Sequence, residues 1–192
     1  MQSGGAGTEQ LVLTSTENLN HELWPEARRL YHQAFPQEGR KSDAVIKRMF
    51  ERRIGMLHMG QLGQQVAAMA ITGISDDGRV LLIDYLTVRE DLRGQGIGVA
   101  FVDAVSRWAM EEQGLEGMLI EVEADGSPVN AERVRFWGNC GFTPTEYVHS
   151  YRWVPEPYRA MYRWFKQGSD LPVDGEILFR YITGFHHKAY AK

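Results

Sequence analysis

The chain has 192 residues, which is enough for one domain with a full-sized hydrophobic core and few for two. Its content of 43% hydrophobic and 24% charged residues is typical of globular proteins and argues against a disordered chain. The formal net charge of −4 argues against nucleic acid as the main ligand, because phosphate backbones require a clustered basic surface.

The sequence also bears on where the protein resides. Cys140 is the only cysteine, so no internal disulfide can form and a reducing compartment is expected. No apolar run approaches the roughly 18 residues of a membrane span, and no signal-peptide pattern opens the chain. We therefore expect a cytoplasmic protein without a membrane partner, and we interpret Cys140 as a packed, inert side chain.

The first part of the chain predicts one strand and two helices. Residues 1–8 show no pattern and are expected to be a disordered leader or a remnant of cloning. Residues 11–13 suggest the strand, and apolar residues at helical spacing predict a helix within residues 18–35. Pro25 is compatible with this helix only near its first turn. A second helix can begin at Ser42 and Asp43.

Three further strands are predicted before the middle of the chain, over residues 56–60, 65–73 and 80–88. Residues 66–71 are apolar throughout, so that strand is placed inside the sheet. Residues 80–88 are rich in Val, Leu, Ile and Tyr, which is typical of a strand buried on both faces.

A glycine-rich turn over residues 93–98, RGQGIG, leads from this strand into a predicted helix. The first N–H groups of a helix lack intrahelical partners and lie at the positive end of the helix dipole, so this position can bind an anion such as phosphate. Alternate glycines remove Cβ atoms and permit positive φ angles, and Arg93 adds a forked donor set. The turn could instead only let the helix pack close to the strand.

Two other phosphate-binding patterns do not fit this turn. The dinucleotide fingerprint requires Gly-x-Gly-x-x-Gly or Ala, but Val99 or Phe101 would occupy its third position. A Walker loop requires a Gly-Lys-Ser or Gly-Lys-Thr ending, which is absent from the turn.

The second half of the chain predicts a strand, a helix and a hairpin. In the strand over residues 118–123, Glu121 and Glu123 share one face because side chains alternate. A helix is expected to open near Asn130. Aromatic-rich residues 148–154 and 158–165 predict a hairpin, with helix as the alternative for the second segment.

The end of the chain predicts a terminal helix with Asp174 as its candidate N-cap. Its apolar stripe would pack on the domain or on a second copy of it, which is compatible with a homodimer. His186 and His187 lack acidic or cysteine partners at ligand spacing in the sequence, so no metal site is expected.

The turn at residues 93–98 closely resembles the acyl-CoA-binding signature of the GNAT superfamily of N-acetyltransferases. That signature is Arg or Gln, two residues, Gly, one residue, then Gly or Ala, and Arg93, Gly96 and Gly98 fill it. Residues 130–142 resemble the GNAT helix that ends in an aromatic pair, three residues and Gly-Phe. In arrangement, the resemblance extends over about residues 11–165.

The resemblance implies an α/β fold of mixed α+β character. We expect a single GNAT-like domain with a mixed, splayed sheet of six to seven strands flanked by helices, and an extra C-terminal helix. The acyltransferase domain would span residues 9–168 and the helical extension residues 169–192. The strands at residues 81–88 and 118–123 would diverge, and the pantetheine of acyl-CoA would lie between them.

The same resemblance implies an N-acetyltransferase that transfers an acetyl (acyl) group from acetyl-CoA to a primary amine of a small molecule or peptide, by direct attack in a ternary complex. The main chain near Leu86 and Val88 would pair with the pantetheine as with another strand, and the turn would hold the pyrophosphate. The expected cofactor contacts are Leu86, Thr87, Val88, Arg93, Gly94, Gln95, Gly96, Ile97, Gly98, Val99, Asn130 and Phe136.

Aminolysis of a thioester requires a base, because a protonated amine with a pKa of roughly 10.4 cannot attack. The candidates are Glu121, Glu123 and Asp84, acting through water, although each could instead form a salt bridge or a solvated strand face. The expected acceptor contacts are Glu38, Arg40 and Tyr85. Solvated loop charges would also explain the first two.

One residue departs from the family pattern. Many members carry Tyr as the second residue of the aromatic pair, where its hydroxyl is thought to protonate the leaving thiolate, but this chain has Trp137. A thiol with a pKa of roughly 8.5 can leave unaided at modest cost, and Tyr85 and Tyr151 are alternative acids or core aromatics. Trp137 motivates a second hypothesis, a catalytically silent acyl-CoA sensor. O-acylation is a third, because the turn recognises the cofactor and not the acceptor.

Overall fold

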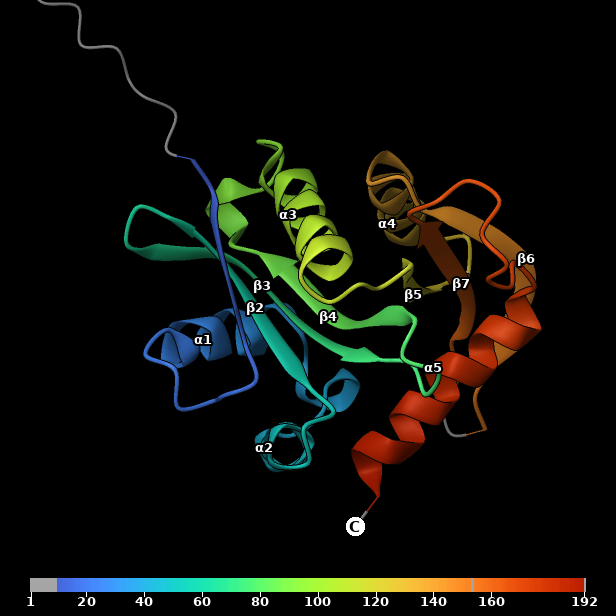
Figure 1. Ribbon diagram of the computed structural model, residues 1–192, viewed down its shortest axis with the longest axis horizontal. Helices are drawn as coiled ribbons and strands as arrows, with labels where there is room; N and C mark the ends of the chain where they lie inside the picture. Colours follow the sequence, from blue (N-terminus) through green and yellow to red (C-terminus); the bar gives the residue numbers. More distant parts are fainter. Residues whose placement is uncertain (1–9, 153, 192) are drawn as a thin grey trace, which may run out of the picture.

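A seven-stranded mixed sheet is the framework of the structure, a computed structural model that describes residues 10–152 and 154–191. The strand order is β1-β2-β3-β4-β5-β7-β6 (Figure 1). Neighbouring strands are antiparallel except β4 and β5, which are parallel. This confirms the predicted mixed sheet. The strands are β1 (Val12–Thr16), β2 (Met56–Leu62), β3 (Gln65–Ile74), β4 (Val80–Val88), β5 (Gly117–Glu123), β6 (Thr143–Ser150) and β7 (Pro157–Trp164).

Helices cover both faces of the sheet (Figure 1). One face carries α1 (Trp24–Ala34), α2 (Asp43–Glu51) and α5 (Gly175–Tyr190), and the other carries α3 (Ile97–Glu111) and α4 (Pro128–Asn139). Each face has its own buried core, the first around Met49 and Phe179 and the second around Phe101 and Trp137. The short 3-10 helices η1 (Gln37–Gly39) and η2 (Glu90–Leu92) precede α2 and α3.

Capping side chains begin three of the helices. The Ser42 hydroxyl accepts from the Val45 N–H at the start of α2, and the Ser127 hydroxyl caps α4 in the same way. The Asp174 carboxylate accepts from the Ile177 N–H at 3.0 Å, which confirms the predicted N-cap of α5. Pro25 is the second residue of α1, where no intrahelical hydrogen bond is lost.

Several predicted boundaries were inaccurate. The first helix begins at Trp24 and not near Asn18, because residues 18–23 form turns closed by side chains such as that of Asn18. The strand predicted for residues 148–154 is β6, which already begins at Thr143 because it pairs with β7 from there. β7 is a strand and not the alternative helix, since it pairs with both β5 and β6.

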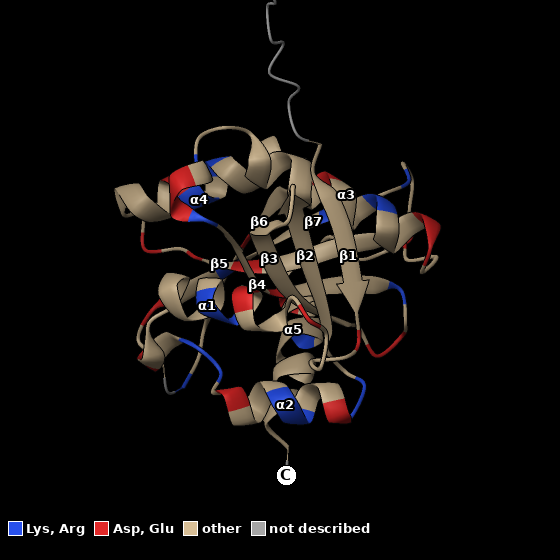
Figure 2. Ribbon diagram, turned by 90° about the vertical axis from the view of Figure 1, so that its left-hand side faces the viewer, with Lys and Arg blue, Asp and Glu red and all other residues tan. Residues whose placement is uncertain are grey.

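Some predictions concern residues outside the described ones. These are the leader over residues 1–8, Trp153 in the predicted strand of residues 148–154, and Lys192 in the extension. Lys and Arg are interspersed with Asp and Glu on α1, α2 and α4 (Figure 2). None of the helices in the described part of the chain is long and apolar enough to cross a membrane.

A buried histidine links the three strands at one edge of the sheet. His58 of β2 is completely buried, and its Nδ1 lies 2.8 Å from the Ser15 hydroxyl of β1. Its Nε2 lies 2.9 Å from the Thr72 hydroxyl of β3, and its ring contacts Trp108 edge-on. Burial lowers the pKa of His58 from 6.5 to about 3, because the charged ring would lose its hydration.

We therefore predict that stability falls as the pH is lowered through the titration of His58 in the unfolded chain. Below pH 6.5 His58 becomes protonated in the unfolded chain but stays neutral in the folded protein, so the folding equilibrium shifts towards the unfolded state. The expected loss from pH 7 to pH 5 is about 2 kcal/mol from this group. Urea denaturation of the wild type and of His58→Asn at both pH values measures it. Equal pH dependence in the two proteins would contradict the prediction.

Candidate active site

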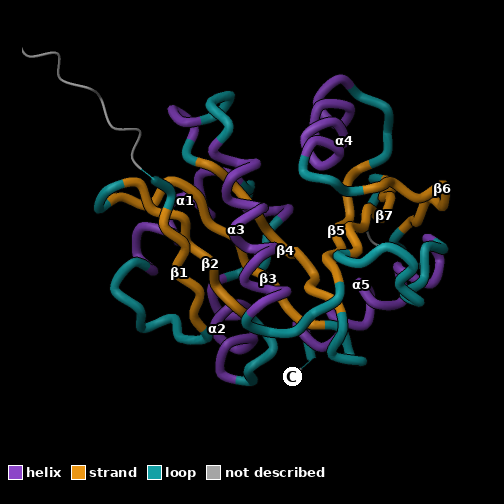
Figure 3. The backbone as a smooth tube through the Cα atoms, turned by 45° about the horizontal axis from the view of Figure 1, so that its top comes forward, coloured by secondary structure: helices purple, strands orange, loops and turns teal. Residues whose placement is uncertain are grey.

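The parallel strands β4 and β5 pair only along their first halves. Residues 80–83 lie opposite residues 117–120, and beyond them no pair joins the two strands among the described residues. Both strands continue, and they diverge towards their carboxyl ends (Figure 3). The edge of β4 over residues 84–88 that faces β5 is therefore without a strand partner, as an extended ligand requires. The predicted splay is confirmed.

A β-bulge bends β4 where the strands part. Ile71 of β3 pairs with Tyr85, but the next residue, Thr72, pairs with Ile83, so Asp84 is an extra residue on β4. Such an insertion bends its strand and re-aims the neighbouring side chains. Asp84 and Tyr85 consequently both contact Lys41, on the face covered by α1, α2 and α5. The predicted base Asp84 lies at the apex of the divergence.

The turn between β4 and α3 exposes a row of backbone donors. Gly94 and Gly96 have φ angles of 73° and 81°, the positive values that the glycine pattern predicted. Among the described residues, the N–H groups of residues 94–99 have no hydrogen-bond acceptor, whereas the N–H of Ala100 donates to Gly96. A Cβ atom at Gly94 or Gly96 would meet no other residue's heavy atoms within 4 Å. The opening of α3 is thus free to bind an anion.

Gly98 has a packing role that differs from that of the other two glycines. A Cβ atom at Gly98 would lie 2.9 Å from the ring of Phe136, so the glycine lets the first turn of α3 approach α4. Phe136, a predicted cofactor contact, accordingly packs beside the opening of α3. The exposed Arg93 lies at the rim and donates from Nε to the Val88 carbonyl at 3.1 Å, which ties the turn to β4.

Polar side chains from distant parts of the chain meet at the divergence on the opposite face of the sheet. Lys41 Nζ lies 2.7 Å from Asp84 Oδ1 and 3.2 Å from His186 Nδ1. His186 Nε2 lies 2.8 Å from Glu121 Oε1, and the Tyr151 hydroxyl donates to Glu121 Oε2 at 2.6 Å. We call Lys41, Asp84, Glu121, Tyr151 and His186 the polar cluster. It joins β4 and β5 to α5 and to the segments before α2 and after β6.

Lys41 and Asp84 form the buried half of the polar cluster, each with a side chain 2% exposed. Burial opposes the charge of Lys41, but the attraction and hydrogen bond of Asp84 together with Tyr85 and Tyr190 outweigh it, so the pKa of Lys41 is raised. The main chain of Lys41 is held by the hydroxyls of Tyr85 and Tyr31. Asp84 Oδ2 is buried and has no hydrogen-bond partner among the described residues. Lys41 is therefore a fixed cation.

Glu121 and His186 form the accessible half of the polar cluster. Their side chains are 19% and 24% exposed, and both line a small pocket together with Ile83, Asp84, Ile120 and Phe185. Burial and the neighbouring Glu121 carboxylate raise the pKa of Tyr151, so its hydroxyl keeps its proton at neutral pH.

Glu123 is bound differently from Glu121, although the two share a strand. Its carboxylate accepts from Asn130 Nδ2 at 3.0 Å and lies 3.3 Å from the guanidinium of Arg133. Asn130, a predicted cofactor contact, also donates to Asp125 and accepts from Arg133, so its amide joins the start of α4 to the end of β5.

Of the three predicted acceptor contacts, Glu38 lies on η1, Arg40 directly follows it, and Tyr85 lies on β4. Glu38 is exposed, and Arg40 donates to the Phe35 carbonyl at 2.6 Å. The Tyr85 ring packs edge-on against Tyr31 and Phe35. Only Tyr85 of the three contacts the polar cluster, through the main chain of Lys41.

Trp137 and Cys140 belong to the core beneath α4. Trp137 is 6% exposed and packs edge-on against Phe136 and Phe142, so it is a structural residue in the second core. Burial raises the pKa of Cys140 to about 11, which keeps the thiol protonated and inert, as expected. The described residues contain no group of three or more His, Cys, Asp or Glu side chains arranged to hold a metal ion.

Nothing in the sequence pattern marked Lys41 or His186 as a residue of this site. A lone lysine in a loop carries no motif, and the acidic neighbours of His186 lie 65 and 102 positions away in the chain, at Glu121 and Asp84. The adjacent histidines 186 and 187 in an amphipathic helix are the one signal in the sequence, and their spacing predicts no metal site.

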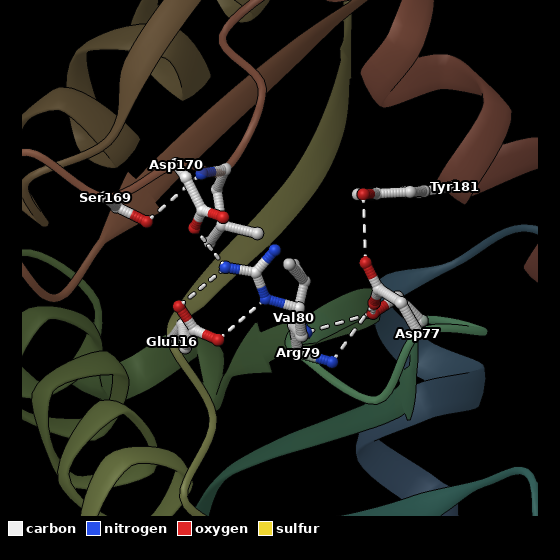
Figure 4. Close-up of polar contacts among 9 residues, drawn as sticks. Asp77, Arg79, Val80, Glu116, Ser169, Asp170 and Tyr181 are labelled. Atoms are coloured by element: carbon white, nitrogen blue, oxygen red, sulfur yellow. Dashed lines mark hydrogen bonds and ion pairs between the residues drawn. The ribbon is translucent and has the colours of Figure 1, made fainter.

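Ion pairs beside the first residues of β4 and β5 anchor the neighbouring elements (Figure 4). Arg79 donates to both oxygens of Glu116, at 2.7 and 2.9 Å, and to Asp170, so its pKa is raised. Asp77 accepts from the Tyr181 hydroxyl of α5 at 3.0 Å. The paired ends of β4 and β5 are thus fastened to α5 and to the loop before it.

Comparison with known proteins identifies the family of this chain. The family model described as "Acetyltransferase (GNAT) family" matches residues 17–142, and the chain belongs to this family. None of the curated proteins matches the sequence. The match covers the opening of α3 and ends before β6, β7 and α5.

Solved structures share the fold at low sequence identity. A protein of Bacteroides thetaiotaomicron assigned to the GNAT family is 16% identical with a TM-score of 0.66, and the match covers 93% of this chain and 96% of that one. The ribosomal-protein-S18-alanine N-acetyltransferase of Escherichia coli is 16% identical with a TM-score of 0.60, covering 85% and 99%. An acetyltransferase of Bacillus subtilis, in complex with CoA, is 15% identical with a TM-score of 0.57, covering 82% and 100%.

Substitution by alanine should have opposite effects on stability at Gly96 and at Gly138, although both positions have space for a methyl group. Gly96→Ala should lower the free energy of unfolding by about 1 kcal/mol, because an L-residue is strained at a φ of 81° although space is available. Gly138→Ala, the control at an equally open position within α4, should raise it by about 0.5 kcal/mol. Urea denaturation measures both. Equal effects of the two substitutions would contradict the backbone conformation of the turn.

Proposed function

We propose that the protein is an N-acetyltransferase that transfers an acetyl group from acetyl-CoA to a primary amine of a small molecule or peptide within a ternary complex. The observation that carries the proposal is the divergence of β4 from β5, which leaves an unpaired strand edge leading to the open donors of residues 94–99. An extended chain with amide groups and a diphosphate matches both features.

The turn before α3 offers binding groups for the diphosphate of the cofactor. The N–H groups of residues 94–99 would bind the pyrophosphate, with Arg93 at the rim as a further donor. The main chain of Leu86, Thr87 and Val88 would pair with the pantetheine, and Phe136 would flank it. Acetyl-CoA supplies the acyl group as a thioester, which is activated for attack by an amine.

Glu121 is the proposed base among the three predicted carboxylates. Asp84 is nearly inaccessible and bound to the Lys41 ammonium, and Glu123 is paired with Arg133. Glu121 is partly exposed beside the divergence. Its carboxylate would take one proton from the acceptor ammonium, and the neutral nitrogen would then attack the thioester carbon. The carbon–sulfur bond breaks as coenzyme A leaves as a thiolate, which takes up the second proton that the nitrogen loses on forming the amide.

An amine acceptor agrees with the charge of the site. Lys41 balances Asp84, so Glu121 leaves the polar cluster with a net negative charge that attracts a protonated amine. Glu38, Arg40 and Tyr85 would line the approach to it. The E. coli protein of this fold is named for N-acetylation of an alanine, which also presents an amine.

Binding of coenzyme A tests the cofactor site. Wild-type protein should bind coenzyme A in calorimetry, and Arg93→Ala should weaken binding by about 10-fold because a charged donor to phosphate is lost. Arg107→Ala, at an exposed arginine of α3, should bind as the wild type does. Wild-type protein that gives neither heat nor a thermal shift with coenzyme A would overturn the proposal.

Turnover tests the base. Thiol release from acetyl-CoA should occur with at least one member of a panel of amines, and Glu121→Gln should lower kcat by about 100-fold without changing the affinity for coenzyme A. Glu111→Gln on the exposed side of α3 is the matched control and should leave kcat unchanged. Binding of coenzyme A without turnover across the panel would favour the acyl-CoA sensor instead.

A further inference from the structure

His186 reaches the proposed base from a helix that lies beyond the family-matched region. That match ends at residue 142, whereas α5 spans Gly175–Tyr190. The His186 ring places Nε2 2.8 Å from Glu121 Oε1. The adjacent His187 is exposed, so α5 directs only one of its two histidines into the polar cluster.

The neighbours of His186 determine which ring nitrogen carries the proton. The Lys41 ammonium can only donate hydrogen bonds, so Nδ1, at 3.2 Å from Lys41 Nζ, must accept. The Glu121 carboxylate can only accept, so Nε2 must donate. His186 is therefore the tautomer with its proton on Nε2, and it gives that hydrogen bond to Glu121.

The helix holds His186 in place through contacts along its whole length. Tyr181 donates to Asp77, and Lys188 is paired with Asp76 in the same turn. Phe185 packs so closely on β3 that a Cβ atom at Gly73 would lie 2.1 Å from its ring. The residue next to His186 is thus seated against the sheet, which leaves the histidine little freedom to turn away.

We propose that His186 is a positioning residue for acyl transfer, in which its Nε2–H orients the Glu121 carboxylate. The inference rests on the proposed function, because it assigns Glu121 as the base. Tyr151 donates to the other carboxylate oxygen, so two donors from opposite sides fix the plane of the group. The carboxylate is thereby held in one orientation, in which its remaining lone pairs can receive the proton of the acceptor.

The titratable groups around Glu121 and His186 come from each element packed there. They are Lys41 before α2, Asp84 and Tyr85 of β4, Tyr151 after β6, Tyr158 of β7 and Tyr190 of α5. Burial raises the pKa of Tyr85 and Tyr151, and that of Tyr158 to about 12, so these three hydroxyls stay protonated near neutral pH. Lys41 and Asp84 neutralise one another.

Two substitutions of His186 distinguish the contact made by Nε2 from the contact made by Nδ1. The amide nitrogen of glutamine can occupy the position of Nε2, whereas asparagine reaches only the position of Nδ1. His186→Gln should therefore keep kcat/KM within about 3-fold of the wild type, and His186→Asn should lower it by about 10-fold, as expected for one lost hydrogen bond. His187→Gln is the control.

The outcomes distinguish this inference from the proposed function. If the wild type turns over an amine and His186→Asn keeps its kcat/KM, the positioning role is wrong. If the wild type has no turnover, the proposed function is wrong, and the positioning role is wrong with it.

Nitrogen-15 NMR of the wild type gives a second readout that does not depend on the folding of a variant. It should show the His186 proton on Nε2, and a proton on Nδ1 alone would overturn the inference.

Discussion

The parting of β4 from β5 is the constraint on which the rest of the site depends. The two strands pair over only four positions, and the extra residue Asp84 bends β4 where the pairing ends. On one face the separation leads to the glycine turn at the start of α3, and on the other to the polar cluster. If β4 and β5 continued to pair, each strand would cover the free edge of the other. The edge of β4 would then be unavailable to a ligand, and β4 would fill the space beside Glu121.

A buried ion pair fixes the inner end of this opening. Lys41 and Asp84 are both nearly inaccessible, and such a pair adds little net stability because two charges lose their hydration. Removal of one partner leaves the other charge buried and unpaired, which costs about 3–5 kcal/mol. The pair ties the segment before α2 to the bulge of β4.

The residues of the candidate site come from two parts of the chain. The family-matched part contains the glycine turn, the diverging strands, Lys41 and the carboxylates of Asp84 and Glu121. The later part supplies Tyr151 and His186, which both bind Glu121. Anchors at Asp76 and Asp77 hold α5 against the sheet, so the base candidate is in contact with residues that lie beyond the family match.

The sequence by itself determined the local features of this protein. The strand and helix pattern, the capping residue Asp174 and the positive φ angles of Gly94 and Gly96 were predictable, because each depends on residues that are neighbours in the chain. Only the tertiary structure decided that Gly98 admits Phe136, that Trp137 is a core residue and that Lys41 and His186 meet beside Glu121. Those contacts join segments up to 145 positions apart, and they follow from how helices pack on a sheet with a bulge, which periodicity does not encode.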